Sequence, residues 1–284
     1  MDKLSVQEQM CFSTTRIRTW DDKGNAYSGS GFFFNFKIGD DILPLLITNK
    51  HVVNGMVKGC FLMSEQDEQG NPLYKKHFNI NFESNFKDNW IFHPNSNVDL
   101  CALPILPLVE AAKRLGGHRL FYRTFDNSLI PNQEIAETFD VAEDVLMIGY
   151  PDGLWDSVNN MPIVRRGTTA TQYKLDYNGK KEFIVDAACF PGSSGSPILM
   201  CNIGSFRNKY GGTEFGKSRF YLLGILYAGP QHSINGDIKV VTIPTASQAI
   251  ISRSTIPNNL GFIIKSERIL EFAEPIKKII EKRK

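Results

Sequence analysis

Hydrophobic residues in this chain occur mostly in short runs that alternate with polar residues or are rich in β-branched side chains. Gly, Asn, Asp and Pro separate these runs, and each of these residues favours turns. The runs read TRIRTW, SGFFFNF, LPLLITNKHVV, FNINF, DLCALPI, DVLMIGY, RRGTTATQY, EFIVDAA, SPILM, FYLLGILYAG, IKVVTIP and LGFIIK. Many short strands at this spacing are typical of antiparallel barrels or sandwiches. We therefore predict a mainly β fold.

Helical spacing of apolar residues is confined to a few segments. It is found at about 107–116 and 245–252, and most clearly at 266–283. Pro275 is expected to kink or split the last of these helices, because proline lacks a backbone N–H. The segment 202–219 is polar and rich in glycine, so we expect a mobile loop there, close to the serine-rich stretch that precedes it.

Composition places the chain among folded globular proteins. Its 284 residues are 42% hydrophobic and 22% charged. The net charge of +2 is too small to indicate a nucleic-acid partner or an anionic membrane. The N-terminal segment has no apolar stretch of the length of a secretory signal, and no later run is long enough to span a bilayer. We expect a cytoplasmic protein that binds neither nucleic acid nor membrane.

No cofactor or metal is expected. The chain has five cysteines, an odd number without paired spacing, which predicts reduced thiols. Four other histidines have no Cys or acidic residue at the sequence spacing that metal ligands usually show. They are His77, His93, His118 and His232. Arg165 and Arg166 precede a strand, and we expect both to be solvated, although they are also placed to touch an acidic substrate or partner.

Three stretches carry residues suited to nucleophilic catalysis. A serine nucleophile needs a base beside it and a third group that orients the base. In LLITNKHVV an apolar strand leads into His51, and in SNVDLCALPI Asp99 precedes an alternating run. In PGSSGSP, Ser194 lies between Gly192 and Gly195.

Each stretch also has a plainer interpretation. A single histidine after a strand is more often structural, an aspartate before a strand is usually a turn or cap residue, and Gly-Ser-Ser-Gly occurs in linkers. Their joint occurrence, in the order His, Asp, Ser and each beside a strand, favours catalysis.

These stretches resemble the signatures of the chymotrypsin-fold, or trypsin-like, serine peptidases. The matching segments are TNKH at 48–51, DLCAL at 99–103 and GSSGSP at 192–197. The subgroup that the chain resembles most is the HtrA-like peptidases, through segments 29–32, 148–154, 164–170 and 185–188. No PDZ-like segment follows, so the oligomeric chaperone function of that subgroup is not carried over.

The resemblance implies two six-stranded antiparallel β-barrels with the site in the cleft between them. It places the N-terminal barrel at about 1–110, the C-terminal barrel at about 135–265, and a C-terminal helix at 266–284, all within one peptidase domain.

The resemblance also implies roles for individual residues. Ser194 corresponds to the nucleophile, His51 to the general base and then acid, and Asp99 to the group that orients the imidazole. The backbone amides of Gly192 and Ser194 correspond to the oxyanion hole. Ser193 stands where trypsin-like zymogens have the aspartate that pairs with a new N-terminus, and no Ile-Val-Gly-Gly cleavage sequence precedes the first barrel. This departure predicts control by a loop such as 202–219 or by a regulatory protein partner.

For the first specificity pocket, the resemblance places Ala188 at the base and Leu226, Tyr227, Ala228 and Gly229 on the wall. None of these residues carries an acid that would bind Lys or Arg, so a small or medium apolar P1 side chain is expected.

The sequence thus predicts a serine endopeptidase that cleaves protein or peptide substrates through an acyl-enzyme. Two alternatives stay open. One is a catalytically inactive trypsin-like module that binds or scaffolds other proteins. The other is a hydrolase of small esters, against which the lack of a Gly-x-Ser-x-Gly elbow counts.

Overall fold

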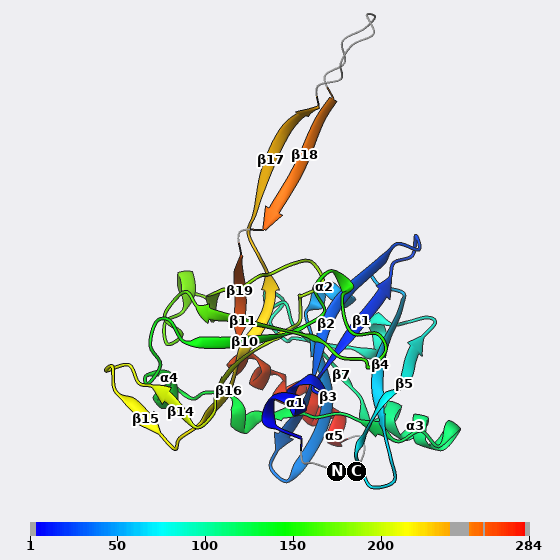
Figure 1. The fold of residues 1–284 in the computed structure, drawn as a ribbon. Helices are drawn as coiled ribbons and strands as arrows, with labels where there is room; N and C mark the ends of the chain where they lie inside the picture. The colour runs from blue at the N-terminus through cyan, green and yellow to red at the C-terminus, as the bar shows by residue number, and fades with distance from the viewer. Residues whose placement is uncertain (1–3, 239–249, 258, 282–284) are drawn as a thin grey trace, which may run out of the picture.

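The computed structural model describes residues 4–238, 250–257 and 259–281. Two β-structured halves pack against each other and form the body of the molecule, and a long hairpin projects from it (Figure 1). The C-terminal helical segment lies against the body on the side away from the hairpin (Figure 1).

The N-terminal half is a nine-stranded sheet. Its hydrogen-bonded order is β5-β4-β1-β2-β3-β7-β6, with β8 paired to β4 and β9 to β2. Within the described residues this order does not close into a ring. The strands are β1 (Thr14–Trp20), β2 (Ala26–Ile38), β3 (Asp41–Thr48), β4 (Lys58–Gln66), β5 (Pro72–Phe82), β6 (Ile91–Phe92), β7 (Cys101–Pro104), β8 (Leu120–Phe121) and β9 (Phe125–Asp126).

The C-terminal half is a closed barrel of six strands. Their order around the barrel is β10-β11-β12-β19-β16-β13, and every neighbouring pair is antiparallel. The expected six-stranded barrel is therefore confirmed for this half, whereas the N-terminal half has more strands than expected and an open order. The strands are β10 (Asp144–Gly149), β11 (Ile163–Thr169), β12 (Glu182–Asp186), β13 (Pro197–Asn202), β16 (Arg219–Ala228) and β19 (Leu260–Lys265).

The middle of strand β2 is buried on both faces, which explains the run of phenylalanines in its sequence SGFFFNF. Successive side chains of a strand point to opposite faces. Phe32, Phe34 and Phe36 pack in a cluster that also contains C-terminal residues such as Ile148, whereas Phe33 packs inside the N-terminal half. The first cluster joins the two halves, so we keep the prediction of a single domain.

The helices are few and short, as the sequence predicts. They are α1 (Val6–Cys11), α2 (Lys50–Val53), α3 (Leu106–Gly116), α4 (Gln133–Ala136) and α5 (Ala273–Glu281). The prediction at 107–116 is confirmed by α3. Among the described residues, no helix combines the length and the apolar character that crossing a membrane requires.

The C-terminal helix is split, as expected. A 3-10 segment (Ser266–Phe272) precedes α5, and Pro275 lies in the first turn of α5. Proline is tolerated there, because the first N–H groups of a helix have no intrahelical partner, and the break falls where its ring would clash with a preceding carbonyl.

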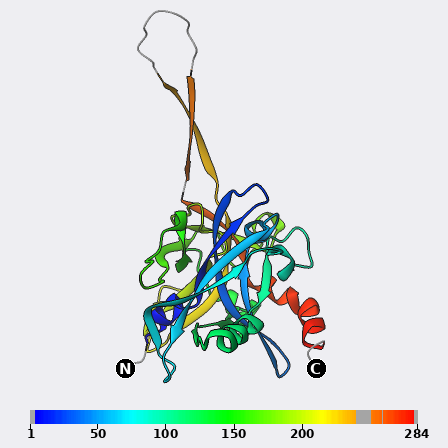
Figure 2. The same cartoon turned by 90° about the vertical axis from the view of Figure 1, so that its right-hand side faces the viewer.

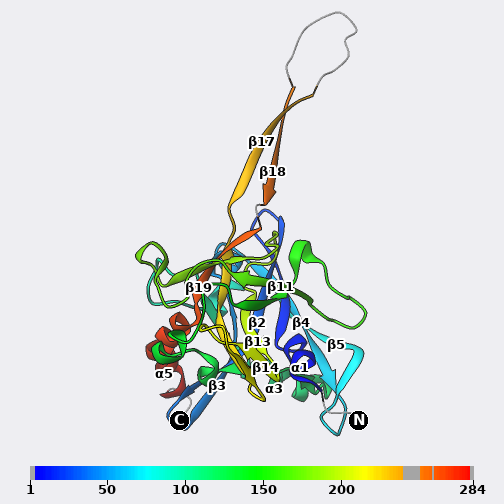
Figure 3. The ribbon, with the colours of Figure 1, turned by 60° about the vertical axis from the view of Figure 1, so that its left-hand side comes forward.

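The projecting hairpin consists of β17 (Gln231–Ile238) and β18 (Ile250–Pro257), which pair with each other. It leaves the barrel after β16 and returns to β19, the neighbour of β16 (Figures 2 and 3). The helix predicted at 245–252 is wrong for 250–252, which lie in β18, and 245–249 lie outside the described residues. The predicted strand at 238–244 also lies outside them, apart from its first residue.

The segment 202–219 does not border the serine stretch, contrary to expectation. It contains a small hairpin, β14 (Ser205–Arg207) and β15 (Thr213–Phe215), and Lys209 donates a hydrogen bond to the carbonyl of Glu137. The six-residue strand β13 carries the chain about 3.3 Å per residue away from Ser194. The hairpin therefore lies at the other end of the barrel.

Candidate active site

His51 lies just beyond the end of a buried strand. Strand β3 ends at Thr48, and His51 is the second residue of the four-residue helix α2. The imidazole side chain is 49% exposed. A rigid strand thus delivers the ring to the surface, as the sequence predicts.

Asp99 contacts three consecutive residues at the start of α2. Its backbone carbonyl accepts hydrogen bonds from Asn49 Nδ2 at 2.9 Å and from the Lys50 N–H at 3.3 Å. Its carboxylate accepts from the His51 N–H at 2.9 Å and lies 2.5 Å from Nδ1 of the same residue. In a neutral ring, this contact favours the proton on Nδ1 and leaves Nε2 free to act as a base.

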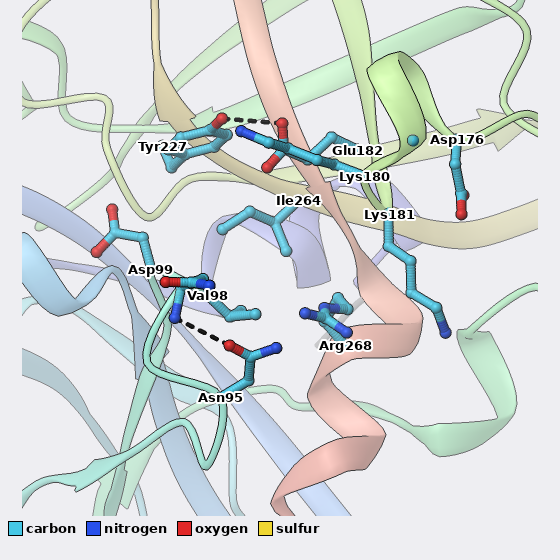
Figure 4. Close-up of a pocket in the computed structure, with 12 residues that line it drawn as sticks. Asn95, Val98, Asp99, Asp176, Lys180, Lys181, Glu182, Tyr227, Ile264 and Arg268 are labelled. Carbon is cyan, nitrogen blue, oxygen red and sulfur yellow. Dashed lines mark hydrogen bonds between the residues drawn. The ribbon is translucent and has the colours of Figure 1, made fainter.

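The Asp99 carboxylate is partly exposed to solvent. Its side chain is 24% exposed, because a pocket of about 660 Å³ opens onto it. Lys180, Glu182 and Arg268 line the opposite side of this pocket (Figure 4). One flank of the carboxylate therefore faces His51 and the other faces solvent.

Tyr227 lines the pocket beside Asp99, where its hydroxyl donates a hydrogen bond to Glu182 at 3.0 Å (Figure 4). Burial and the Glu182 carboxylate raise the pKa of Tyr227, so the phenol stays protonated at neutral pH. Its neighbours Leu226 and Ala228 line a different pocket. This separation follows from the alternation of side chains along β16.

The loop that carries Ser194 contains two glycines in the left-handed region. Gly192 has φ +83° and Gly195 has φ +88°. A Cβ on Gly192 would lie 2.7 Å from the carbonyl oxygen of Tyr150, and one on Gly195 would lie 2.5 Å from Thr48 Oγ1. Both the backbone conformation and the lack of space thus require glycine.

The backbone amide of Gly192 is free in this loop. The carbonyl of Pro191 accepts a hydrogen bond from the Asp152 N–H at 2.6 Å. In a trans peptide the N–H points away from the carbonyl, so the N–H of Gly192 faces the opposite side. Among the described residues, no hydrogen-bond acceptor is found for it.

The amide of Ser194 is arranged in the same way. The carbonyl of Ser193 accepts from the Ser196 N–H at 3.0 Å, and the N–H of Ser194 has no acceptor within the described part of the chain. The two amides that sequence reasoning assigned to an oxyanion hole are thus both available as donors.

The serine loop packs on the strands that lead to His51. The carbonyl of Ser194 accepts a hydrogen bond from the Ser30 N–H at 2.8 Å, and the Thr48 hydroxyl donates to the carbonyl of Ser30 at 2.7 Å. Across residues 4–238, 250–257 and 259–281, no hydrogen bond joins the Ser194 hydroxyl to His51. Such bonds are often long in a free enzyme and shorten when substrate binds.

A pocket of about 210 Å³ opens beside Ser194. Three of the residues predicted for the first specificity pocket line it, namely Leu226, Ala228 and Gly229, whereas Ala188 and Tyr227 are not among its lining residues. The structure adds residues from the segment before Ser194 and from the end of the opposite wall; they are Cys189, Phe190, Pro191 and Pro230. The apolar character of Cys-Phe-Pro just before the serine stretch was the sequence signal for the first three.

Arg165 is half-buried beside this pocket, although we expected it to be solvated. Its guanidinium donates a hydrogen bond to the carbonyl of Ala188, and its Cζ lies 5.0 Å from the centre of the Phe190 ring. Burial lowers the pKa of this guanidinium. Arg165 therefore supports the backbone and the ring that form one side of the pocket. Arg166, in contrast, is exposed and pairs with Asp144.

The described residues contain no group of three or more His, Cys, Asp or Glu side chains that could hold a metal ion. His93 is buried and its Nε2 lies 3.0 Å from the carbonyl of Arg268, where burial lowers its pKa. It stabilises the contact between the N-terminal half and the C-terminal helical segment.

Similarity to known proteins is found among solved structures and in one family model. None of the curated proteins matches the sequence. The solved structures that it resembles include the active form of the Rv3671c protease from M. tuberculosis, which is 15% identical, with a TM-score of 0.44 over 93% of this chain and 80% of that one. They also include a protein named GrC, which is 13% identical, with a TM-score of 0.48 over 99% of this chain and 98% of that one.

The model of one protein family matches residues 29–205, which is more than half of the chain. The family is described as the trypsin-like peptidase domain. The matched segment includes His51, Asp99 and Ser194, the three residues on which the resemblance was first based. The chain therefore belongs to the family of trypsin-like peptidase domains.

Proposed function

We propose that this protein is a serine endopeptidase that cleaves protein substrates through an acyl-enzyme intermediate. The observation that carries the proposal is the 2.5 Å contact between His51 Nδ1 and the Asp99 carboxylate, in a chain of the trypsin-like peptidase family. This contact orients the imidazole and stabilises its charged form.

In the proposed mechanism, the Ser194 hydroxyl attacks the scissile carbonyl while Nε2 of His51 takes its proton. The free amides of Gly192 and Ser194 donate hydrogen bonds to the resulting oxyanion, and each is worth about 3 kcal/mol of transition-state stabilisation. His51 then protonates the leaving amine, and water hydrolyses the acyl-enzyme by the same steps in reverse.

The pocket beside Ser194 supports a preference for a small or medium apolar P1 residue. Its lining side chains are uncharged, and it has room for a single side chain. One methylene group in such a pocket discriminates by only about 1–3 kcal/mol. We therefore propose that an extended substrate also pairs its backbone with segment 226–229.

The assignment to the HtrA-like subgroup, a cytoplasmic location and control by a regulatory protein are retained as predictions. Their basis is the sequence: the motifs at 29–32 and 148–154, and the uncharged Ser193 that stands where a zymogen has an aspartate.

A fluorophosphonate probe tests the proposal. The wild-type protein is expected to be labelled and to cleave a denatured protein, and Ser194→Ala is expected to lose both activities. Ser193→Ala is the matched control, because it removes the adjacent buried hydroxyl and must still be labelled. Labelling that persists in Ser194→Ala would refute the assignment.

The binding-module alternative rests on one observation, the missing hydrogen bond between Ser194 and His51 in the described residues. If the folded wild-type protein neither reacts with the probe nor cleaves peptides with apolar P1 residues, this alternative replaces the proposed peptidase. Labelling without cleavage of any peptide would instead support the ester hydrolase.

A further inference from the structure

Ser30 is a buried residue of β2 whose hydroxyl is bonded to two segments of the other half. The side chain is fully inaccessible to solvent. Its Oγ donates a hydrogen bond to the carbonyl of Gly192 at 2.9 Å and accepts one from the N–H of Tyr150 at 3.0 Å. These hydrogen bonds connect the N-terminal sheet to the turn that precedes the nucleophile.

The backbone of Ser30 also forms hydrogen bonds in this region. Its N–H donates to the carbonyl of Ser194, and its carbonyl accepts from the hydroxyl of Thr48, the last residue of β3. One residue is thus bonded to both sides of the nucleophile loop and to the strand that leads to His51.

The peptides on either side of Gly192 need such a support. Glycine rotates freely about its backbone bonds, so these peptides can turn and point their carbonyls into the oxyanion hole. Asp152 holds the first peptide through the carbonyl of Pro191. The second peptide is held at both ends: Ser30 donates to the carbonyl of Gly192, and the Ser193 N–H donates to the carbonyl of Phe190 at 3.1 Å.

Residue 193 does not hold this turn in place through an ion pair. Ser193 carries no charge, and its buried hydroxyl has no hydrogen-bond partner in the described part of the chain. The structure therefore assigns Ser30 as a positioning residue that keeps the turn at Gly192 in the conformation in which both oxyanion amides face the substrate. This inference rests on the proposed peptidase function and names the contact that prepares its site.

The hydroxyl of Ser30 lies in a closely packed, solvent-inaccessible place: a Cβ on Gly149 would lie only 2.7 Å from Ser30 Oγ. In Ser30→Ala the carbonyl of Gly192 and the N–H of Tyr150 would both lose their partner, and an unpaired buried group favours any rearrangement that pairs it. Rotation of the peptide after Gly192 is one such rearrangement.

The test compares Ser30→Ala with Thr19→Val by steady-state kinetics. Thr19 is also fully buried in the N-terminal sheet, and its hydroxyl has no partner among the described residues. The substrate is a fluorogenic peptide amide with alanine at P1, and the inhibitor is the aldehyde of the same peptide, whose adduct with the nucleophile places its oxygen in the oxyanion hole. Active sites are counted with a fluorophosphonate.

We expect Ser30→Ala to lower kcat per active site by about 10- to 100-fold, to raise the inhibition constant of the aldehyde by a similar factor, and to change KM by less than about threefold. Thr19→Val is expected to change none of these values. A merely structural role would lower the number of active sites and leave kcat and the inhibition constant per site unchanged, and that result would overturn the inference.

Ser30→Cys is the second variant, in case Ser30→Ala does not fold. The thiol is a weak donor, so intermediate values of kcat and of the inhibition constant are expected; wild-type values per site in Ser30→Cys would count against the assignment. The two proposals fail differently: turnover that survives in Ser194→Ala refutes the peptidase mechanism, whereas full activity in Ser30→Ala refutes only the positioning role.

Discussion

The two parts of the candidate site are held in place in different ways. His51 and Asp99 both belong to the N-terminal half, are partly exposed, and contact each other through side-chain hydrogen bonds. The Ser194 loop belongs to the C-terminal half and is packed tightly, with the flanking Ser193 and Ser196 almost fully buried. It depends on glycine conformations and on bonds from Ser30 in the other half.

Because of this difference, the two parts of the site are expected to respond differently to substitutions. In the His51–Asp99 pair, the proposed chemistry depends on side chains that solvent already reaches, so a substitution there is expected to alter charge and proton transfer more than packing. In the Ser194 loop, the proposed chemistry depends on the direction of backbone amides, so a single added methyl group is expected to matter. Four predictions test this comparison, in order of decreasing effect.

Asp99→Asn is expected to lower kcat/KM by about 10⁴-fold, because an amide favours the wrong tautomer of His51 and does not stabilise its cation. The fold should persist, since the backbone carbonyl of Asp99 still accepts from Asn49 and Lys50. Peptide hydrolysis and thermal unfolding measure the two effects. A loss of less than about tenfold would mean that Asp99 has no orienting role.

Gly192→Ala is expected to lower kcat by about 10²- to 10³-fold, the loss typical of one oxyanion donor. Its Cβ would crowd the carbonyl of Tyr150 and force the turn to change. Gly211→Ala is the matched control, because Gly211 has φ +85° but nothing within 4 Å of an added Cβ. Equal activities in the two variants would show that crowding at Gly192 is irrelevant.

Ala228→Val is expected to narrow the pocket and to lower cleavage after medium apolar residues by about tenfold relative to cleavage after alanine or glycine. Cleavage profiles of a peptide library measure this ratio. Tyr227→Phe changes the neighbouring residue, which lines the other pocket, and should leave the P1 profile unchanged. A P1 profile that responds to Tyr227 and not to Ala228 would reverse the assignment of the two pockets.

Substitution of Cys189 is expected to have the smallest effect on peptide hydrolysis. Burial raises the pKa of its thiol to about 11, so the thiol stays neutral between pH 6 and pH 9. Alkylation by iodoacetamide should be slower than that of a free cysteine and should still rise between pH 9 and pH 10, as mass spectrometry can follow. The pH profile of peptide hydrolysis should be the same in Cys189→Ser; a plateau of alkylation at pH 8 would contradict the raised pKa.

The family and much of the fold could be predicted from local patterns. The stretches around His51, Asp99 and Ser194 identified the family that the family model confirms. Most predicted strands are present, because each alternating run buries one face. Strand β4 was missed, since the polar residues at both of its ends hide the buried positions Phe61 and Met63.

The rest depends on contacts between distant segments. The sequence does not show that Ser30 meets Gly192, which lies 162 positions further along the chain. It placed Tyr227 in the same pocket as Ala228, although the pleat of β16 separates them. The hairpin β17–β18 forms a separate two-stranded sheet, and the sequence did not predict that its strands would pair with each other and not with the barrel.

That hairpin is continuous with the wall of the pocket beside Ser194. Strand β16, which supplies Leu226 and Ala228 to the pocket, continues past Gly229 and Pro230 into one arm of the hairpin, and the other arm returns to the adjacent barrel strand β19. A protein that binds the arms of this hairpin and shifts them would therefore act, through Gly229 and Pro230, on the wall of the proposed P1 pocket.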